Sequence, residues 1–263
     1  MNLAVLIPCY NSRDLLLDTL KSFSCIGVGI IIVDDGSDIE LNYDEILECA
    51  VGAKEVILFK NNINIGITES LNIGLKIAHK NGFEYVARLD AGDICLDNRI
   101  KKQYEFMEKN ELDLCGSFVE FVDDDGNHLF NFTPPETDFD LKRAIKKYNP
   151  FIHPAVMFKL SSVLNVGGYP ISYPALEDWA LFMALSKKYK MGNVPDVLLK
   201  YVVSSQSIST LKRETQARSK VKLLIDNFDL NVSSIIGIVR NLIVLYIPRE
   251  FLTQVKRFVY RWK

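Results

Sequence analysis

Closely spaced cysteine pairs are missing from this 263-residue sequence, although it contains five cysteines. An odd number of scattered thiols is typical of a reducing compartment and does not suggest a disulfide framework. We therefore expect free thiols, and no zinc site built from cysteine pairs. The cysteines are Cys9, Cys25, Cys49, Cys95 and Cys115.

Long hydrophobic runs are missing as well. A membrane-spanning helix needs about 20 predominantly apolar residues, whereas the longest candidate, Ile235 to Ile247, is shorter and is interrupted by Arg240 and Asn241. At the start of the chain, an apolar run without preceding basic residues stops at Pro8. We interpret this run as a first strand and not as a signal peptide, and expect a cytoplasmic protein.

Both common glycine-rich phosphate loops are also missing. The sequence contains neither G-x-x-x-x-G-K-[ST] nor G-x-G-x-x-G, so any nucleotide must be bound by a different arrangement of residues.

Charge is distributed unevenly along a chain that is 48% hydrophobic and 24% charged. Residues 1–210 carry 20 Lys+Arg against 29 Asp+Glu, and residues 211–263 carry 11 against 4. The hydrophobic content is sufficient for a full core. The acidic body argues against nucleic acid as a partner.

Apolar segments alternate with helical patterns over the first ninety residues. Strands are expected at Leu3 to Ile7, Ile30 to Val33, Val56 to Phe59 and Tyr85 to Leu89, with helices between them. This alternation predicts an α/β fold with a mostly parallel sheet.

After residue 97 the alternation is lost. A helix to about Asn110, strands at 114–122 and 155–158, and helices at 138–148 and 177–188 are expected there.

Carboxylates follow two of the predicted strands. Asp34 and Asp35 end one strand, and Asp90 and Asp93 end another. The carboxyl ends of parallel strands meet at one crevice, so these side chains are candidates to bind a divalent cation and a diphosphate. The alternative interpretation is that they belong to ordinary turns and helix caps.

An exposed aromatic ring and a turn glycine accompany these acids. Tyr10 follows the first strand and could stack on a base, or it could simply pack on its neighbours. Gly36 allows a tight turn beside Asp35, whose carboxylate can accept a hydrogen bond from a uracil or a ribose.

Taken in order, the motifs resemble those of family 2 glycosyltransferases, which have the GT-A fold, a Rossmann-like sheet flanked by helices. The resemblance covers residues 3–200. The matching segments are Val5 to Asn11, Ile32 to Ser37, Asn62 to Gly66, Leu71 to Leu75, Ala87 to Asp93, His153 to Met157, Gly167 to Tyr169 and Leu176 to Trp179.

The resemblance implies inverting transfer of a sugar, usually from a UDP-sugar, with Mn²⁺ or Mg²⁺. It assigns uracil stacking to Tyr10, uracil hydrogen bonding to Asp35, and the first metal ligand to Asp90. Gly92 occupies the third position of the metal motif and cannot ligate, so either Asp93 supplies the second ligand or the metal is bound weakly. The nucleotide-sugar site implied in this way comprises Pro8, Tyr10, Asn11, Asp35, Asn64, Gly66, Arg88 and Asp90.

The acidic pair Glu177 and Asp178 matches the segment in which this family has its general base, and we assign that role to Asp178. The attacking hydroxyl must lose a proton, and a positioned carboxylate can accelerate that step by roughly 10²–10⁴-fold. Alternatively, both acids simply favour the N-terminus of a helix. His153 is a candidate pocket residue, although a structural role is more usual for a lone histidine.

The chain is expected to divide into a GT-A domain, 1–210, and a basic amphipathic helical tail, 211–263. Within the domain, residues 1–110 would bind the nucleotide and 111–210 the acceptor. Six bases and many aromatic and aliphatic residues in 235–263 suggest an interfacial helix pair on an anionic membrane. The alternative is a basic helix packed on the body.

Membrane attachment would suit a lipid-diphosphate-linked sugar acceptor. The resemblance therefore points to a galactosyl- or glucosyltransferase of O-antigen or capsule synthesis, peripherally bound to the inner face of a bacterial plasma membrane. Two alternatives are a catalytically silent nucleotide-sugar-binding partner in a glycan assembly complex and, with less support, a nucleotidyltransferase.

Overall fold

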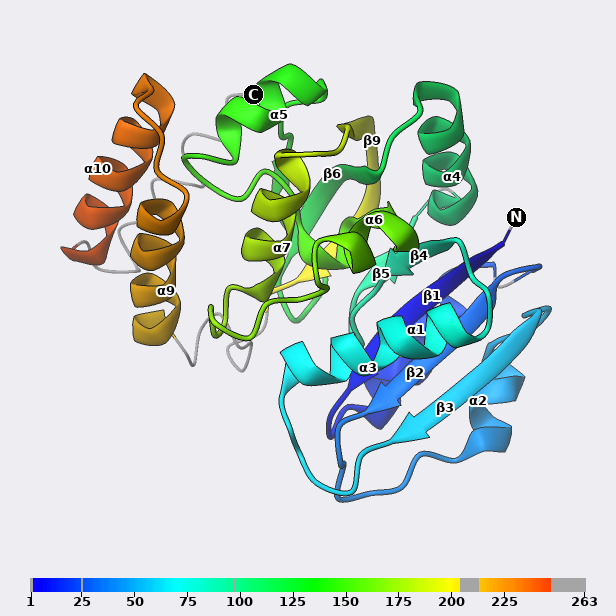
Figure 1. Ribbon diagram of the computed structural model, residues 1–263. Coiled ribbons are helices and arrows are strands. Elements are labelled where there is room, and N and C mark those ends of the chain that lie inside the picture. The colour runs from blue at the N-terminus through cyan, green and yellow to red at the C-terminus, as the bar shows by residue number, and fades with distance from the viewer. Residues whose placement is uncertain (1, 25, 97, 204–212, 247–263) are drawn as a thin grey trace.

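The computed structural model describes residues 2–24, 26–96, 98–203 and 213–246. Helices cover both faces of a nine-stranded sheet with the order β3-β2-β1-β4-β8-β6-β9-β5, and β7 pairs with β6 outside this path (Figure 1).

The first half of the sheet is parallel, as predicted. Strand β1 pairs with both β2 and β4, and β3 lies at the edge beside β2. The chain thus builds outwards from β1 in one direction and then starts again at β4 on its other side, and in open α/β sheets the carboxyl ends of strands at such a point are where ligands bind. The elements of this half are β1 (Leu3–Cys9), α1 (Arg13–Lys21), β2 (Gly29–Asp34), α2 (Tyr43–Cys49), β3 (Glu55–Lys60), α3 (Ile67–Lys80) and β4 (Tyr85–Arg88).

The second half of the sheet is mixed. Strand β8 is antiparallel to β4 and β6, whereas β9 is parallel to β6 and antiparallel to β5. The parallel prediction does not extend here, because β6 turns directly into the hairpin strand β7 and no helix crosses between them. The elements are β5 (Ile94–Cys95), α4 (Arg99–Asn110), β6 (Leu114–Val122), β7 (His128–Phe132), α5 (Asp138–Ala144), η1 (His153–Ala155), β8 (Met157–Lys159), α6 (Leu160–Asn165), α7 (Glu177–Ser186) and β9 (Met191–Val202).

The side chains of alternate strand residues pack into two hydrophobic cores, one on each face of the sheet. In β1, Ala4 and Leu6 pack on the side of α3, α6 and α7, while Leu3, Val5 and Ile7 pack on the side of α1, α2 and α4. A strand that is buried on both faces has a continuous run of apolar residues in its sequence, and for this reason β1 and β2 could be predicted.

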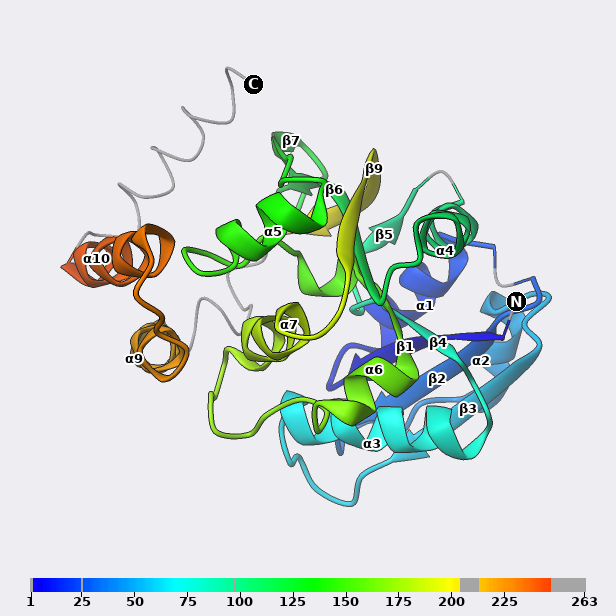
Figure 2. The same cartoon turned by 45° about the horizontal axis from the view of Figure 1, so that its top comes forward.

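Helices α9 (Arg213–Asp226) and α10 (Val232–Tyr246) lie side by side at the edge of the molecule (Figures 1 and 2). Leu223 and Leu224 are buried in the core that includes α7. The side chain of Asn241 donates to Lys147 O at 3.0 Å. The described part of the tail therefore packs on the body, although α10 also leaves large apolar side chains exposed, among them Val239 at 51%.

Among the described residues, none of the helices has the length and apolar content required to cross a membrane. The second helix of the predicted interfacial pair, beyond Pro248, lies outside the described residues.

Candidate functional site

The end of β1 presents Tyr10 and Asn11 at the crevice. The Tyr10 side chain is 48% exposed, so its ring is accessible to a ligand. Asn11 has a left-handed backbone with φ 49°. Its N–H donates to Ser37 Oγ at 2.9 Å, and its side chain exchanges two hydrogen bonds of 2.9 Å with Asp38. Pro8, one residue before the end of β1, forms part of this fixed strand end.

The two acids after β2 have different surroundings. Asp34 Oδ1 accepts hydrogen bonds from Ser37 N at 2.9 Å and Ser37 Oγ at 2.6 Å. This is the turn-capping role considered above, and Gly36 takes the positive φ of 76° that the turn requires. Within the described chain, Asp34 Oδ2 is buried without a hydrogen-bond partner.

Asp35 organises the loop between β3 and α3. Its Oδ1 accepts from Asn61 Nδ2 at 2.9 Å and Ile65 N at 3.0 Å, and its Oδ2 accepts from Gly66 N at 2.8 Å. A carboxylate has about four acceptor positions, so three bonds leave capacity for a ligand donor. Asn64 lies in the same loop and is exposed.

Arg88 lies beneath the site. Its side chain is fully buried, and its guanidinium donates to Leu6 O, to Leu89 O at 3.2 Å and to Asp90 Oδ1 at 2.5 Å. Arg88, expected in the nucleotide-sugar site, is thus engaged with protein groups in this conformation. What Arg88 contacts is Asp90, which remains 39% exposed and retains a second oxygen for a ligand.

Asp93 points inwards, away from solvent. It is 4% exposed, its Oδ1 accepts from Val202 N at 3.2 Å, and its Oδ2 has no partner within the described residues. Burial raises the pKa of the Asp93 carboxyl well above its usual range, and the negative charge of Asp90 adds to this effect. The inward orientation follows from Gly92, whose φ of 105° turns the chain and whose N–H donates to Thr19 Oγ1 at 2.9 Å.

The acidic pair begins helix α7. Thr68 Oγ1 donates to Glu177 Oε2 at 3.5 Å, and Asn149 Nδ2 donates to Asp178 Oδ2 at 2.8 Å. Burial raises the pKa of Glu177 to about 7, with a further contribution from the charge of Asp178. Burial also raises the pKa of Asp178, against the N–H of Trp179 and the positive charge of Lys220.

Electrostatic coupling shows that these acids share one region. The negative charge of Asp90 raises the pKa of both Glu177 and Asp178. Thr68 connects Glu177 to α3, whose N-terminal Gly66 is bound by Asp35. The structure thus gathers residues that are separated by more than 140 positions in the sequence.

His153 has a structural environment beside this site. Its Nε2 is 2.8 Å from Tyr169 Oη and accepts from Arg88 Nε at 3.3 Å. Burial, together with the positive charge of Arg88, lowers the pKa of His153 well below its usual range. The imidazole is therefore neutral, and its Nε2 helps to hold the Arg88 side chain in place by accepting a hydrogen bond from it.

Several residues that shape the site were not recognised in the sequence. Asn61, Thr68 and Asn149 each donate a hydrogen bond that orients one of the acids. Asparagine and threonine in loops carry no spacing pattern of their own, although Asn61 directly follows a predicted strand.

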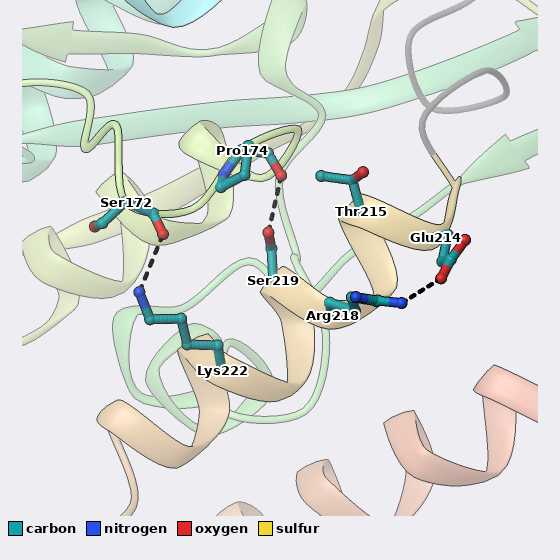
Figure 3. Close-up of a pocket in the computed structure, with 7 residues that line it drawn as sticks. All are labelled: Ser172, Pro174, Glu214, Thr215, Arg218, Ser219 and Lys222. Atoms are coloured by element: carbon teal, nitrogen blue, oxygen red, sulfur yellow. Dashed lines mark hydrogen bonds and ion pairs between the residues drawn. The ribbon is translucent and has the colours of Figure 1, made fainter.

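A groove of about 660 Å³ lies between helix α9 and the segment that precedes α7 in the sequence (Figure 3). Its lining residues are Ser172, Pro174, Glu214, Thr215, Arg218, Ser219 and Lys222.

Solved structures with the same fold bind nucleotides or nucleotide sugars. The Staphylococcus aureus protein TarS, solved with UDP-GlcNAc, matches with a TM-score of 0.67 over 98% of this chain and 79% of that one, at 15% identity. A Pyrobaculum calidifontis mannosyltransferase, solved with GDP-Man and Mn²⁺, matches with a TM-score of 0.65 over 98% and 74%, at 14% identity. At these identities the likeness shows the fold alone.

Relatives found by sequence have a higher identity to this chain than these structures have. The Erwinia amylovora amylovoran biosynthesis glycosyltransferase AmsE is 28% identical over 84% of this chain and 83% of its own. An Escherichia coli UDP-Gal:alpha-D-GlcNAc-diphosphoundecaprenol beta-1,3-galactosyltransferase is 29% identical over 75% and 71%.

The family profile described as "Glycosyl transferase family 2" matches residues 4–164. This match spans β1 to α6 and contains the crevice with Tyr10, Asp35 and Asp90. More than half of the chain, including the strand ends that form the crevice, thus follows one known pattern, and the chain belongs to glycosyltransferase family 2.

Proposed function

We propose that this protein is an inverting glycosyltransferase that moves galactose or glucose from a UDP-sugar to a lipid-diphosphate-linked sugar in bacterial O-antigen or capsule synthesis. The observation that carries the proposal is the hydrogen bond from Thr68 Oγ1 to Glu177 Oε2, which connects the acidic pair to α3, the helix whose N-terminal Gly66 donates to Asp35. The named activities of the E. coli and E. amylovora relatives support it.

The nucleotide would occupy the carboxyl ends of β1 and β2. The exposed ring of Tyr10 is free to stack on the uracil, and Asp35 has a remaining acceptor position for its N–H. Asn11, Asn64 and Gly66 surround this position on two loops that Asp38 and Asp35 hold in place.

A divalent cation fits Asp90 and does not fit Asp93. Asp90 is partly exposed and has one oxygen outside the Arg88 pair, whereas Asp93 is buried with a raised pKa. No group of three possible protein ligands occurs among the described residues. One carboxylate is nevertheless enough where substrate phosphates and water complete the shell, as is usual for Mg²⁺. When bound, Mn²⁺ or Mg²⁺ would neutralise charge that develops on the departing diphosphate.

We assign the general base to Asp178. Burial raises the pKa of Asp178, which strengthens the carboxylate as a proton acceptor, while the Trp179 N–H and the Lys220 charge oppose this rise. Glu177, with a pKa of about 7, retains a proton in about half of the molecules at neutral pH and so reduces repulsion next to the base. Asp178 would accept the proton of the acceptor hydroxyl as it attacks the anomeric carbon opposite the leaving UDP.

We also propose that residues 1–110 bind the nucleotide, that 111–210 bind the acceptor, and that the tail, 211–263, attaches the enzyme to the cytoplasmic face of an anionic membrane. Exposed apolar side chains on α10, including Ile235, Val239 and Ile243, support an interfacial position.

The direct test is mass spectrometry of the purified protein incubated with Mn²⁺, a panel of UDP-sugars and a GlcNAc- or GalNAc-diphosphate-lipid. We expect a hexose-sized mass gain on the acceptor that EDTA abolishes. The Asp178→Asn variant should retain UDP binding and lose turnover by at least about 10²-fold. The matched control is Asp124→Asn, which removes an exposed carboxylate in the β6–β7 turn and should leave turnover unchanged.

A product formed equally by Asp178→Asn would contradict the assignment of the base. Measurable UDP binding without turnover on any acceptor, together with an unchanged glycan phenotype in cells that carry Asp178→Asn, would favour the silent-binder alternative.

A further inference from the structure

Hydrogen bonds hold one wall of the groove between α9 and the segment 172–175. Three residues of α9 donate to carbonyls of the opposite segment: Lys222 Nζ to Ser172 O at 3.2 Å, Ser219 Oγ to Pro174 O at 2.9 Å, and Gln216 Nε2 to Ala175 O at 3.1 Å. Figure 3 shows the first two bonds bridging the groove. In the sequence this segment is followed directly by Leu176, Glu177 and Asp178, so the wall of the groove precedes the proposed catalytic residues.

The groove also carries positive charge. Arg218 and Lys222 line it, and Arg218 pairs at 2.5 Å with Glu214 across an exposed surface, where both side chains are 80% accessible. Exposed pairs of this kind contribute little, about 0–1 kcal/mol, so the guanidinium can exchange Glu214 for a doubly charged ligand. Lys220 is two residues from both Arg218 and Lys222, on a different side of the same helix, and its positive charge opposes the rise in the pKa of Asp178.

A second cavity, of about 440 Å³, continues from the first, because Arg218 and Lys222 line both. Its other walls come from both tail helices and are apolar apart from Asp226. Val221 and Ile225 on α9 and Leu242 on α10 contribute, with Ile225 57% and Leu242 41% exposed.

From the segment that precedes the acidic pair of α7, the lining passes to a groove with Arg218, Lys222 and Glu214, and then to a cavity that shares the two basic residues and is otherwise mainly apolar. A lipid-linked sugar has the matching order of sugar hydroxyl, diphosphate and hydrocarbon chain. Between residues 218 and 225 the helix rises about 10 Å, which is comparable to a diphosphate and the first isoprenyl units.

We propose that the α9 groove, defined by Arg218, Lys222, Ile225 and Leu242, binds the diphosphate and the proximal hydrocarbon of an isoprenyl-diphosphate-linked acceptor. This inference rests on the proposed function, since it names where that acceptor lies. It assigns to the basic tail a role in recognising the substrate.

The test is equilibrium binding of farnesyl diphosphate to the full-length protein, measured by isothermal calorimetry with UDP saturating and EDTA present, so that neither the nucleotide site nor a metal provides the contact. The double variant Arg218→Gln/Lys222→Gln should weaken binding about tenfold or more. The charge-retaining Arg218→Lys/Lys222→Arg variant should remain within about threefold of wild type, and farnesol should bind much more weakly than the diphosphate.

The matched control is Lys101→Gln/Lys109→Gln on the exposed face of α4, on the opposite side of the molecule (Figure 1). It removes the same charge and should leave farnesyl diphosphate affinity unchanged. A second variant, Ile225→Ser/Leu242→Ser, should reduce affinity for farnesyl diphosphate and leave that for isopentenyl diphosphate unchanged. UDP affinity and the unfolding midpoint, measured for every variant, would detect loss of folding.

The inference is overturned if wild type does not bind farnesyl diphosphate, or if the Arg218→Gln/Lys222→Gln variant binds it as well as the α4 control does. It is also overturned if that variant loses only binding to phosphatidylglycerol vesicles, because the groove would then serve the membrane surface. Failure of the transferase assay with intact farnesyl diphosphate binding would instead count against the proposed function.

Discussion

Replacing Arg88 with methionine separates two roles for this residue: direct contact with the donor, and support of Asp90 from below. Methionine keeps much of the apolar stem and removes the guanidinium. If Arg88 supports Asp90, the change should lower the free energy of unfolding. If it binds phosphate directly, UDP affinity should fall while stability is retained.

The magnitude follows from the partners that remain. Removing one member of a buried ion pair usually costs about 3–5 kcal/mol, because the other charge is left buried and unpaired. Here Asp90 is 39% exposed and can be hydrated, and Leu6 O and His153 Nε2 keep second partners in Leu89 N and Tyr169 Oη. We therefore expect a smaller loss, of about 2–3 kcal/mol, which most domains with a total of about 5–15 kcal/mol survive.

Urea denaturation followed by circular dichroism measures this loss, and calorimetry measures UDP affinity on the same preparation. The exposed residue Arg143 on α5 provides the control, since Arg143→Met should change stability by less than about 0.5 kcal/mol. An Arg88→Met variant as stable as wild type that binds UDP more than tenfold more weakly would refute the supporting role.

Three further outcomes are expected. Glu177→Gln should stabilise the fold by about 1–3 kcal/mol at pH 8 and have little effect at pH 4. The reason is that the folded pKa of Glu177, about 7, lies above the unfolded value, so wild type loses stability as the pH rises from the unfolded to the folded pKa. Urea titrations at both pH values would measure the difference. Tyr10→Ala should weaken UDP binding by about 1–3 kcal/mol in calorimetry without changing stability, because its exposed ring is free to stack on a base. Gly168→Ala should lower the free energy of unfolding, measured in urea, by about 2–3 kcal/mol. The reason is that Gly168 has a φ of 75° and an added Cβ would lie 2.7 Å from Asn72 Oδ1. A thermal midpoint equal to that of wild type would contradict this prediction.

The parallel half of the fold was predictable because its signals are local. Leu3 to Ile7 and Ile30 to Val33 are continuous apolar runs, and each is followed by a loop or turn residue and then by a helical pattern. The second half carries weaker signals. Strand β9 was missed, since Asn193, Pro195 and Asp196 interrupt its apolar pattern, and it is stabilised by pairing with β6 some 77 residues earlier.

The sequence motifs of the candidate site were predictable, but the directions in which its side chains point were not. The sequence places Asp90 and Asp93 on one loop, but their different surroundings depend on distant groups. Arg88 pairs with Asp90, whereas the N–H of Val202 and the turn at Gly92 draw Asp93 into the interior. Contacts across 109 residues leave no spacing signal that a single sequence could reveal.

The hydrogen bonds of Asp35 have a consequence for engineering this protein. The Asp35 carboxylate, which is proposed to bind the base, also accepts hydrogen bonds from Asn61, Ile65 and Gly66. The choice of base and the folding of the loop therefore depend on one side chain. A substitution at position 35 intended to admit a different nucleotide would disorder the pocket before it could select a new ligand. Retargeting the donor would therefore have to proceed through the less constrained positions around Asp35, such as the exposed Asn64.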